Sequence, residues 1–201
     1  MGERRKNNRR ERTTLLLKQT LLSFLETMPL HRVQVSKLCI ACHINRATFY
    51  AHYEDIYSLL REIQQDILKD LTSIMETPNP PVLPAAEIGS RFFTYLYERR
   101  KVLRALLLND ADFVFASQLN ELLTSLLRQA VYHQYEIPKE FSAEKLEDIL
   151  HFIVFGHYAY YSRFLLDDTA LTPNSITKAA ELSSELSDSC LRAFLAVREM
   201  E

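Results

Sequence analysis

Glycine is scarce in this chain of 201 residues, where it occurs only at positions 2, 89 and 156. An average chain would contain about 7% glycine. Loops that hold phosphates or dinucleotides need clustered glycines for tight turns and close backbone approach, so nucleotide-dependent enzymes of those kinds are excluded. Sandwiches of many strands also need frequent glycine-rich turns. The scarcity of glycine therefore favours an all-α fold.

The seven prolines separate long stretches in which apolar residues recur at the helical period. The first stretches predict helices over residues 13–27 and, from Ile56 onward, over about five turns. The proline-rich segment 78–84 disfavours helix and predicts a linker. Beyond the linker, the pattern predicts helices over residues 85–98, 101–108, 113–135 and 142–166, and a last helix capped by Asn174. We expect two domains, residues 1–55 and residues 56–201.

One face of the predicted last helix is rich in small residues. It consists of Ile176, Ala179, Ala180, Ser183, Leu186, Cys190, Ala193 and Val197. Small side chains let two helices approach closely, so this face predicts a packing seam, either within one subunit or across a dimer axis.

The net charge of −2 combines two parts of opposite sign. Residues 1–53 contain ten Lys or Arg against three acidic residues, a charge of +7, whereas residues 54–201 carry −9. A basic segment beside an acidic body indicates that the first quarter of the chain meets a polyanion such as a nucleic acid. The alternative is a solvated basic tail, because six of the ten cations lie within residues 4–12.

No apolar stretch reaches the roughly 18 residues that a membrane span needs, and no export signal is recognisable, so we expect a cytoplasmic protein. The segment from Cys39 to His43 matches the C-x-x-C-H pattern of covalent haem attachment. That attachment needs export and a second axial ligand, and cysteine also packs well as a small buried residue. We expect no cofactor and no metal, with zinc binding or redox sensing by the thiols as a weaker alternative.

The segment 33–53 has the pattern of a helix-turn-helix. Val35 and Leu38 fall on one face of a short helix, residues 42–44 form the turn, and Asn45 caps a second short helix.

The second short helix separates its residues into two faces. If Ile44 and Phe49 are buried, the helical period places Arg46, Ala47, Thr48, Tyr50 and His52 on the opposite side. Arginine reads guanine edges, Thr and Ala contact the thymine methyl group, and Tyr, His and a helix N-terminus hold phosphates. This helix is therefore predicted to recognise DNA.

From about residue 12 to residue 60 the sequence resembles the DNA-binding domain of the TetR (AcrR-type) transcriptional regulators. The family pattern is matched at Val33, Val35, Leu38, Ile44, Arg46, Thr48, Phe49, Tyr50, His52, Tyr53, Leu59 and Leu60. The resemblance implies a homodimer of all-helical subunits, each with a recognition helix for the major groove and a C-terminal domain for a small effector. It implies that Arg46 reads a base and that Thr48, Tyr50 and His52 contact phosphates or bases. The full set of predicted DNA contacts is Asn45, Arg46, Ala47, Thr48, Tyr50, His52, Lys37, Arg9 and Arg10.

The sequence departs from the family pattern in three places. His43 and Ala47 stand where glycine is usual, and His43 adopts a left-handed turn conformation only at a cost. Ile56 stands where the family has a lysine that contacts phosphate, and the basic residues 4–10 are expected to compensate as an arm in the minor groove. The segments 53–60 and 97–110 look most like a branch of the family that includes the dihydroxyacetone kinase operon activator.

Aromatic residues in the C-terminal part are candidates for an effector pocket, because such pockets are mostly apolar with a few polar groups. The predicted ligand contacts are Phe93, Tyr97, Phe115, Phe152, Phe155 and Tyr158. The alternative for each ring is that it fills a helical core.

The function expected from the sequence is that of a ligand-responsive repressor that binds a roughly palindromic DNA operator as a homodimer. A protein-binding co-regulator without operator recognition is the alternative that His43 and Ile56 favour. A small-molecule enzyme is a third, but no nucleophile, base and orienting group can be assembled from local spacing, so no catalytic residue is assigned.

Overall fold

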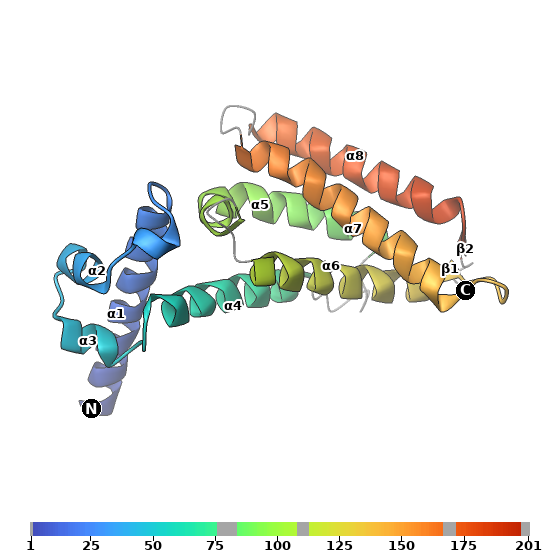
Figure 1. Cartoon of the computed structure of the whole chain (residues 1–201). Coiled ribbons are helices and arrows are strands. Elements are labelled where there is room, and N and C mark those ends of the chain that lie inside the picture. The colour runs from blue at the N-terminus through green and yellow to red at the C-terminus, as the bar shows by residue number, and fades with distance from the viewer. Residues whose placement is uncertain (1, 76–83, 108–112, 167–171, 198–201) are drawn as a thin grey trace. The chain divides into compact units, whose positions relative to one another are not determined.

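The computed structural model describes residues 2–75, 84–107, 113–166 and 172–197. These residues form eight α-helices, one 3₁₀ helix and two short strands (Figure 1), which confirms the all-α prediction. The chain divides into two compact units. Unit 1 comprises Met1–Ile67 and Arg104–Asp112, and unit 2 comprises Leu68–Leu103 and Phe113–Glu201. The division falls within a helix, about three turns after the domain boundary expected at residue 55.

Unit 1 contains the predicted helix-turn-helix. Its elements are α1 (Gly2–Leu25), η1 (Leu30–Arg32), α2 (Val35–Ala41), α3 (Arg46–Tyr50) and the first part of α4 (Ile56–Met75). Leu17, Leu38 and Phe49 are completely buried, so each of the first three helices contributes to one core. Burial of large apolar side chains is the main source of stability for helices as short as α2 and α3.

The first helix, α1, begins earlier than residue 13, where the sequence pattern predicted its start. The helix begins at Gly2, so the predicted basic arm is helical where the structure describes it. After Gly2 the segment has neither glycine nor proline, and Arg, Lys and Glu favour helix. The Asn7 side chain also donates a hydrogen bond of 3.0 Å to Glu11, one turn further on.

The turn between α2 and α3 is a Schellman motif. The Ile44 amide donates to the Cys39 carbonyl (3.0 Å), and the His43 amide donates to the Ile40 carbonyl (3.1 Å). His43 has a φ of 52°, so a histidine occupies the left-handed position that glycine usually fills.

Unit 2 is a helical body with a small sheet at one end. It contains the rest of α4 and most of α5 (Ala85–Leu107), followed by α6 (Phe113–Gln134), β1 (Tyr135–Glu136), α7 (Ala143–Leu166), α8 (Pro173–Arg192) and β2 (Ala196–Val197). Helix α7 packs against α6 and α8, and β1 pairs antiparallel with β2. None of the helices in the described part of the chain has the length and hydropathy needed to span a bilayer.

Three details of unit 2 differ from the prediction. Helix α5 runs unbroken from Ala85 to Leu107, because Arg99 and Arg100 continue a helix readily. The cap of α8 is Thr172, not Asn174: its hydroxyl accepts from the Ser175 amide (3.1 Å), and Pro173 takes the first helical position. The two strands were not predicted, because a two-residue strand has no periodicity to detect.

Half of the predicted small-residue face, four of its eight residues, is buried within the subunit. Ile176, Ala179, Ala180 and Ser183 are buried, whereas Leu186 is exposed. Helix α8 ends at Arg192, so Val197 lies in β2 and does not belong to that face.

Candidate nucleic-acid interface

Helix α3 is held in place by its cap and by one buried ring. The Asn45 carboxamide oxygen accepts hydrogen bonds from the Thr48 amide (2.7 Å) and the Thr48 hydroxyl (2.9 Å), which confirms Asn45 as the cap. Phe49 is completely buried, as predicted, with its ring centroid 5.4 Å from that of Tyr50. A helix of five residues is unstable alone, so these contacts fix the side chains on its outer face.

The outer face of α3 presents the residue types predicted to contact DNA. Arg46, Ala47 and Tyr50 are exposed, and Thr48 is half-buried. The Arg46 guanidinium donates to the Tyr50 hydroxyl at 3.4 Å and lies 5.9 Å from the centre of the Tyr50 ring. The hydrogen bond to Tyr50 raises the pKa of Arg46. The pair orients the guanidinium before any ligand is bound.

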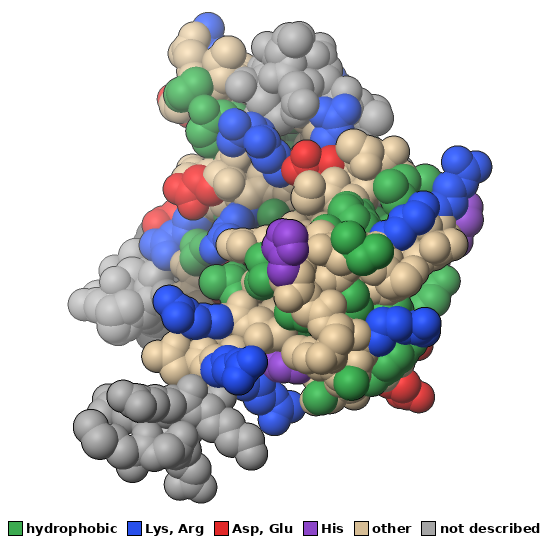
Figure 2. Space-filling view, turned by 90° about the vertical axis from the view of Figure 1, so that its left-hand side faces the viewer, with side chains coloured by type: hydrophobic (Ala, Val, Ile, Leu, Met, Phe, Trp, Pro, Cys, Tyr) green, Lys and Arg blue, Asp and Glu red, His purple; other side chains and the backbone are tan. Residues whose placement is uncertain are grey.

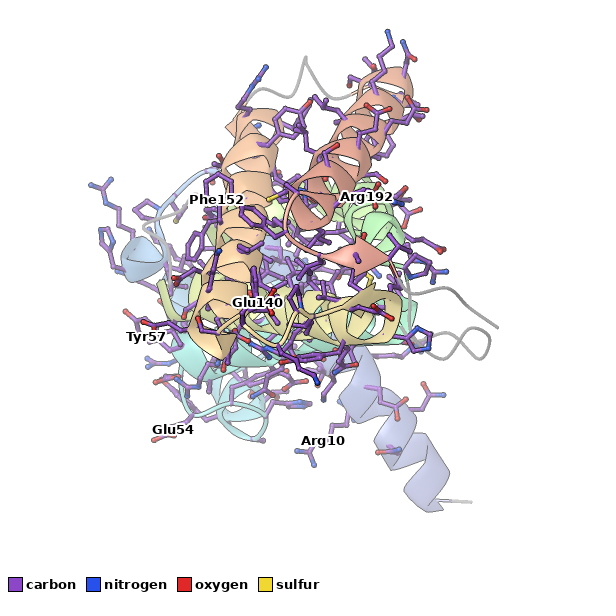
Figure 3. All side chains as sticks on the ribbon, turned by 90° about the vertical axis from the view of Figure 1, so that its right-hand side faces the viewer. Arg10, Glu54, Tyr57, Glu140, Phe152 and Arg192 are labelled. Atoms are coloured by element: carbon purple, nitrogen blue, oxygen red, sulfur yellow. The ribbon has the colours of Figure 1, made fainter. Side chains whose placement is uncertain are left out.

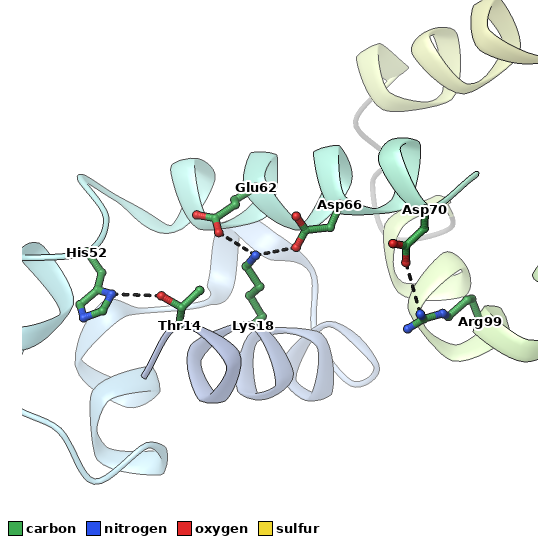
Figure 4. A network of polar contacts seen from close by, with 7 residues as sticks. All are labelled: Thr14, Lys18, His52, Glu62, Asp66, Asp70 and Arg99. Carbon is green, nitrogen blue, oxygen red and sulfur yellow. Dashed lines mark hydrogen bonds and ion pairs between the residues drawn. The ribbon is translucent and has the colours of Figure 1, made fainter. Parts of the chain in front are cut away.

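Helix α1 contributes to the same surface beside His52. The Thr14 hydroxyl lies 3.2 Å from His52 Nδ1, as Figure 4 shows. Partial burial lowers the pKa of His52, and the positive charge of Arg10 lowers it further. The charge of Arg10 (Figure 3) on α1 is therefore close enough to His52 to act on it.

The remaining predicted DNA contacts, Lys37 on α2 and Arg9 on α1, are exposed. Figure 2 shows Lys and Arg side chains spread across the side of the molecule on which α2 and α3 lie. This distribution suits a polyanionic partner.

Lys18 has a different role from these cations. Its ammonium group pairs with Glu62 (2.7 Å) and Asp66 (2.5 Å) on α4 (Figure 4). Burial alone would lower the pKa of Lys18, but the bonds to Asp66 and Glu62 raise it. Lys18 therefore fastens α1 to the start of α4 within unit 1.

The two cysteines of the C-x-x-C-H segment are packing residues. Cys39 and Cys42 are buried, and the Cys42 thiol lies 3.2 Å from the Thr20 hydroxyl. Burial raises the pKa of Cys39, which disfavours the reactive thiolate. Among the described residues, no group of three or more His, Cys, Asp or Glu side chains is placed to hold a metal ion.

The six predicted ligand contacts do not form one site. Phe93 and Phe115 are completely buried in the core, and the Phe93 ring lies 4.0 Å from the Tyr161 ring. Tyr97 and Tyr158 are half-buried, and Phe152 and Phe155 are exposed. Of the six, Phe152 alone lines a groove between α7 and α8, which the sequence pattern did not predict.

Several solved structures share the fold of this chain. No family model and no curated protein matches the sequence. Among solved structures, the dihydroxyacetone kinase operon activator DhaS is 16% identical, with a TM-score of 0.66 over 92% of this chain and 98% of that one. A TetR transcriptional regulator from Streptococcus agalactiae is 15% identical, with a TM-score of 0.68 over 90% and 97%. NalD, the secondary repressor of the MexAB-OprM multidrug efflux pump in Pseudomonas aeruginosa, is 14% identical, with a TM-score of 0.62 over 95% and 100%.

The chain thus has the fold of the TetR-type transcriptional regulators, and the resemblance seen in the sequence is confirmed at the level of fold. The branch to which the segments 53–60 and 97–110 point is represented among these neighbours by DhaS.

Proposed function

We propose that this protein is a sequence-specific DNA-binding transcriptional regulator. The observation that carries the proposal is the capped helix α3, which presents Arg46 and Tyr50 as an oriented pair within a TetR-type fold. Arg46 reads a guanine edge in the major groove. Ala47 and the methyl group of Thr48 contact thymine, because the Thr48 hydroxyl is bonded to Asn45. Phosphates are held by Asn45, Tyr50, His52, Lys37, Arg9 and Arg10.

The regulator acts as a homodimer that forms through α7 and α8. Large apolar side chains are exposed on both helices: Phe152 (74%), Phe155 (54%), Leu182 (42%) and Leu186 (58%). Three of the four line the same groove, and a Cβ atom at Gly156 on α7 would meet nothing within 4 Å. Such a patch is costly to leave in water, and a second copy related by two-fold symmetry covers it with the same patch.

A dimer places two copies of α3 in successive major grooves, about 34 Å apart, on a roughly palindromic operator. A small effector bound in unit 2 favours one conformation, and α4, which continues from unit 1 into unit 2, transmits the change to the DNA-binding units. Effector binding then relieves repression. Such a regulator works in the cytoplasm, and its function needs no enzymatic step.

A co-regulator that has lost operator recognition is the second candidate. It is favoured by Ile56, which is buried at the position where the family has a phosphate-binding lysine.

Selection of bound duplexes from random DNA by the purified full-length protein separates the two candidates. The regulator predicts enrichment of an inverted repeat. Absence of enrichment from a protein that still dimerises would contradict it and support the co-regulator.

A further inference from the structure

Helix α1 continues well beyond the core of unit 1 at its N-terminal end. We call residues 2–12 the N-terminal extension. It contains no apolar side chain, and every side chain of it that the structure describes is exposed. Figure 1 shows this end of α1 continuing past α3. At about 1.5 Å per residue, the extension adds roughly 16 Å of helix to the part of α1 that contributes to the core.

The N-terminal extension is strongly basic. It contains six Lys or Arg against two Glu, a charge of +4. No ion pair joins Arg9, Arg10 or Arg12 to another residue whose side chain the structure describes. A helix that is polar all round gains no stability from packing against its own chain. Charge complementarity therefore indicates a polyanionic partner that lies along this helix.

The extension begins beside the segment that follows α3. The buried stripe of α1, which includes Leu17, continues at the helical period through Thr14 to Arg10. The Thr14 hydroxyl lies 3.2 Å from His52, two residues after the end of α3. The pKa of His52 is lowered by burial and then by the positive charge of Arg10, which places Arg10 near the same ring. The first cations of the extension therefore lie close to the helix-turn-helix.

The helical form of the extension decides which part of a DNA duplex it meets. An α-helix with its side chains is about 10–12 Å across, whereas the minor groove is about 6 Å wide. The major groove admits a helix, but in the proposed function α3 occupies it. A helical extension therefore does not fit the minor groove, where the sequence alone suggested an arm. The phosphates beside the grooves remain as its contact.

We propose that the N-terminal extension binds the phosphate backbone of duplex DNA as a helix, beside the base pairs that α3 reads. Phosphates carry no sequence information, so the extension raises the affinity for every duplex and leaves the choice of operator to α3. The inference names a further contact surface of the regulator and in that respect rests on the proposed function.

A proline at position 8 separates binding as a helix from binding as an extended arm. Asn8→Pro releases residues 2–7 from α1 without changing the charge. Asn8→Ala is the matched control, because it keeps the charge and favours the helix. Full-length Asn8→Pro is expected to bind a duplex with long flanks about tenfold more weakly than Asn8→Ala, because the released segment must be ordered on binding. Binding by Asn8→Pro that is as tight as that by Asn8→Ala, or tighter, would overturn the proposal.

Removal of charge tests the contact with phosphates. Arg4→Gln, Arg5→Gln and Lys6→Gln together remove three cations and keep residues that favour helix. This triple variant should lose the same factor of affinity for a selected and for a scrambled duplex. The slope of log affinity against log salt should fall by about 2–3 for each bound subunit. An unchanged slope, or a loss confined to the selected duplex, would contradict the proposal, whereas thermal unfolding should match that of the wild type.

Flanking sequence and lipid vesicles test other partners of the extension. The affinity of the wild-type protein should be the same for A·T and G·C flanks, because both present the same phosphates. A preference of about tenfold or more for A·T flanks would place the extension in the minor groove. Vesicles of phosphatidylserine that bind the wild type and not the triple variant, with equal duplex affinities in the two proteins, would replace DNA by a lipid surface.

Failure of this inference is distinguishable from failure of the proposed function. Selection of an inverted repeat, with wild-type affinity in Asn8→Pro and in the triple variant, would remove the role of the extension and leave the regulator standing. Absence of selection, with salt-dependent binding that both variants weaken, would do the reverse.

Discussion

In the proposed regulator, single residues of unit 1 divide the work of DNA binding between specificity and affinity. Arg46 is oriented by Tyr50 on the outer face of α3, whereas Arg10 lies on α1 beside His52. The first position suits contact with a base edge, and the second suits contact with a phosphate.

Replacement of Arg46 by Ala is expected to cost about 1–3 kcal/mol of discrimination at one base pair, because a bidentate contact to guanine is lost. Replacement of Arg10 by Ala is the comparison: it should weaken binding to every sequence and reduce the slope of log affinity against log salt by about 1. Affinities for the selected duplex and its point variants at several salt concentrations measure both effects. Equal losses on every duplex in both variants would contradict this division of roles.

His43 stores backbone strain in the turn of the helix-turn-helix. Its φ of 52° is costly for a residue with a Cβ atom, and glycine removes that cost. We expect His43→Gly to raise the free energy of unfolding by about 0.5–1 kcal/mol, even though glycine makes the unfolded chain more flexible. Urea unfolding measures the change. Ala41→Gly is the control: it lies two residues earlier, in the last turn of α2, and should lower the free energy of unfolding by a similar amount. A lower free energy of unfolding in His43→Gly would contradict the prediction and show that the turn needs its histidine.

His157 makes the stability of the protein depend on pH. Burial lowers its pKa from the ordinary value of 6.5, so the folded protein holds it neutral where the unfolded chain binds a proton. Its contribution to stability is complete above about pH 6.5 and is lost as the pH falls below that value, by at most about 1.4 kcal/mol per pH unit. His157→Gln should flatten this part of the curve of unfolding free energy between pH 5 and 7.5.

His52 has a lowered pKa as well, so a slope of the same sign should remain in the His157 variant. An unchanged slope in His157→Gln would mean that other groups cause the loss of stability.

At the scale of the helices, α7 and α8 carry the proposed dimer contact. Phe152, labelled in Figure 3, is the most exposed aromatic residue among the groove-lining residues. In a two-fold symmetric dimer, a glutamate at this position lies near the same glutamate of the second copy, and both copies lose buried apolar area. Phe152→Glu should therefore weaken dimerisation at least about 10²-fold.

Sedimentation equilibrium of the purified protein measures this change. Val114→Glu on α6 is the control, because Val114 is also exposed but does not line the groove, and it should leave the dimer intact. Dissociation by Val114→Glu and not by Phe152→Glu would place the interface elsewhere.

The sequence predicted the elements that have strong local signals. Helix α4 and the Asn45 cap of α3 were predicted correctly, because a long apolar period and a capping side chain are local features. The start of α1 was missed because its first turns have no apolar residues. Helix α5 was predicted as two helices because the apolar period of its sequence is interrupted near Arg99. The groove between α7 and α8 could not be predicted, because residues far apart in sequence create it, as the contact between His157 and Ser187 illustrates.

At the scale of the whole molecule, the charge asymmetry of the chain has a structural counterpart. The basic first quarter of the sequence lies in unit 1, which carries the capped helix α3, whereas unit 2 is formed entirely by the acidic remainder. Under the proposed function, such a distribution attracts DNA to unit 1 and not to unit 2.

The affinity of the wild-type protein for its selected duplex, relative to a scrambled duplex at physiological salt, tests the central claim most directly. A regulator with a working α3 should bind the selected inverted repeat at least about 10³-fold more tightly. A ratio near one, with weak binding that salt abolishes, would contradict sequence-specific recognition and leave only the electrostatic attraction of a basic surface.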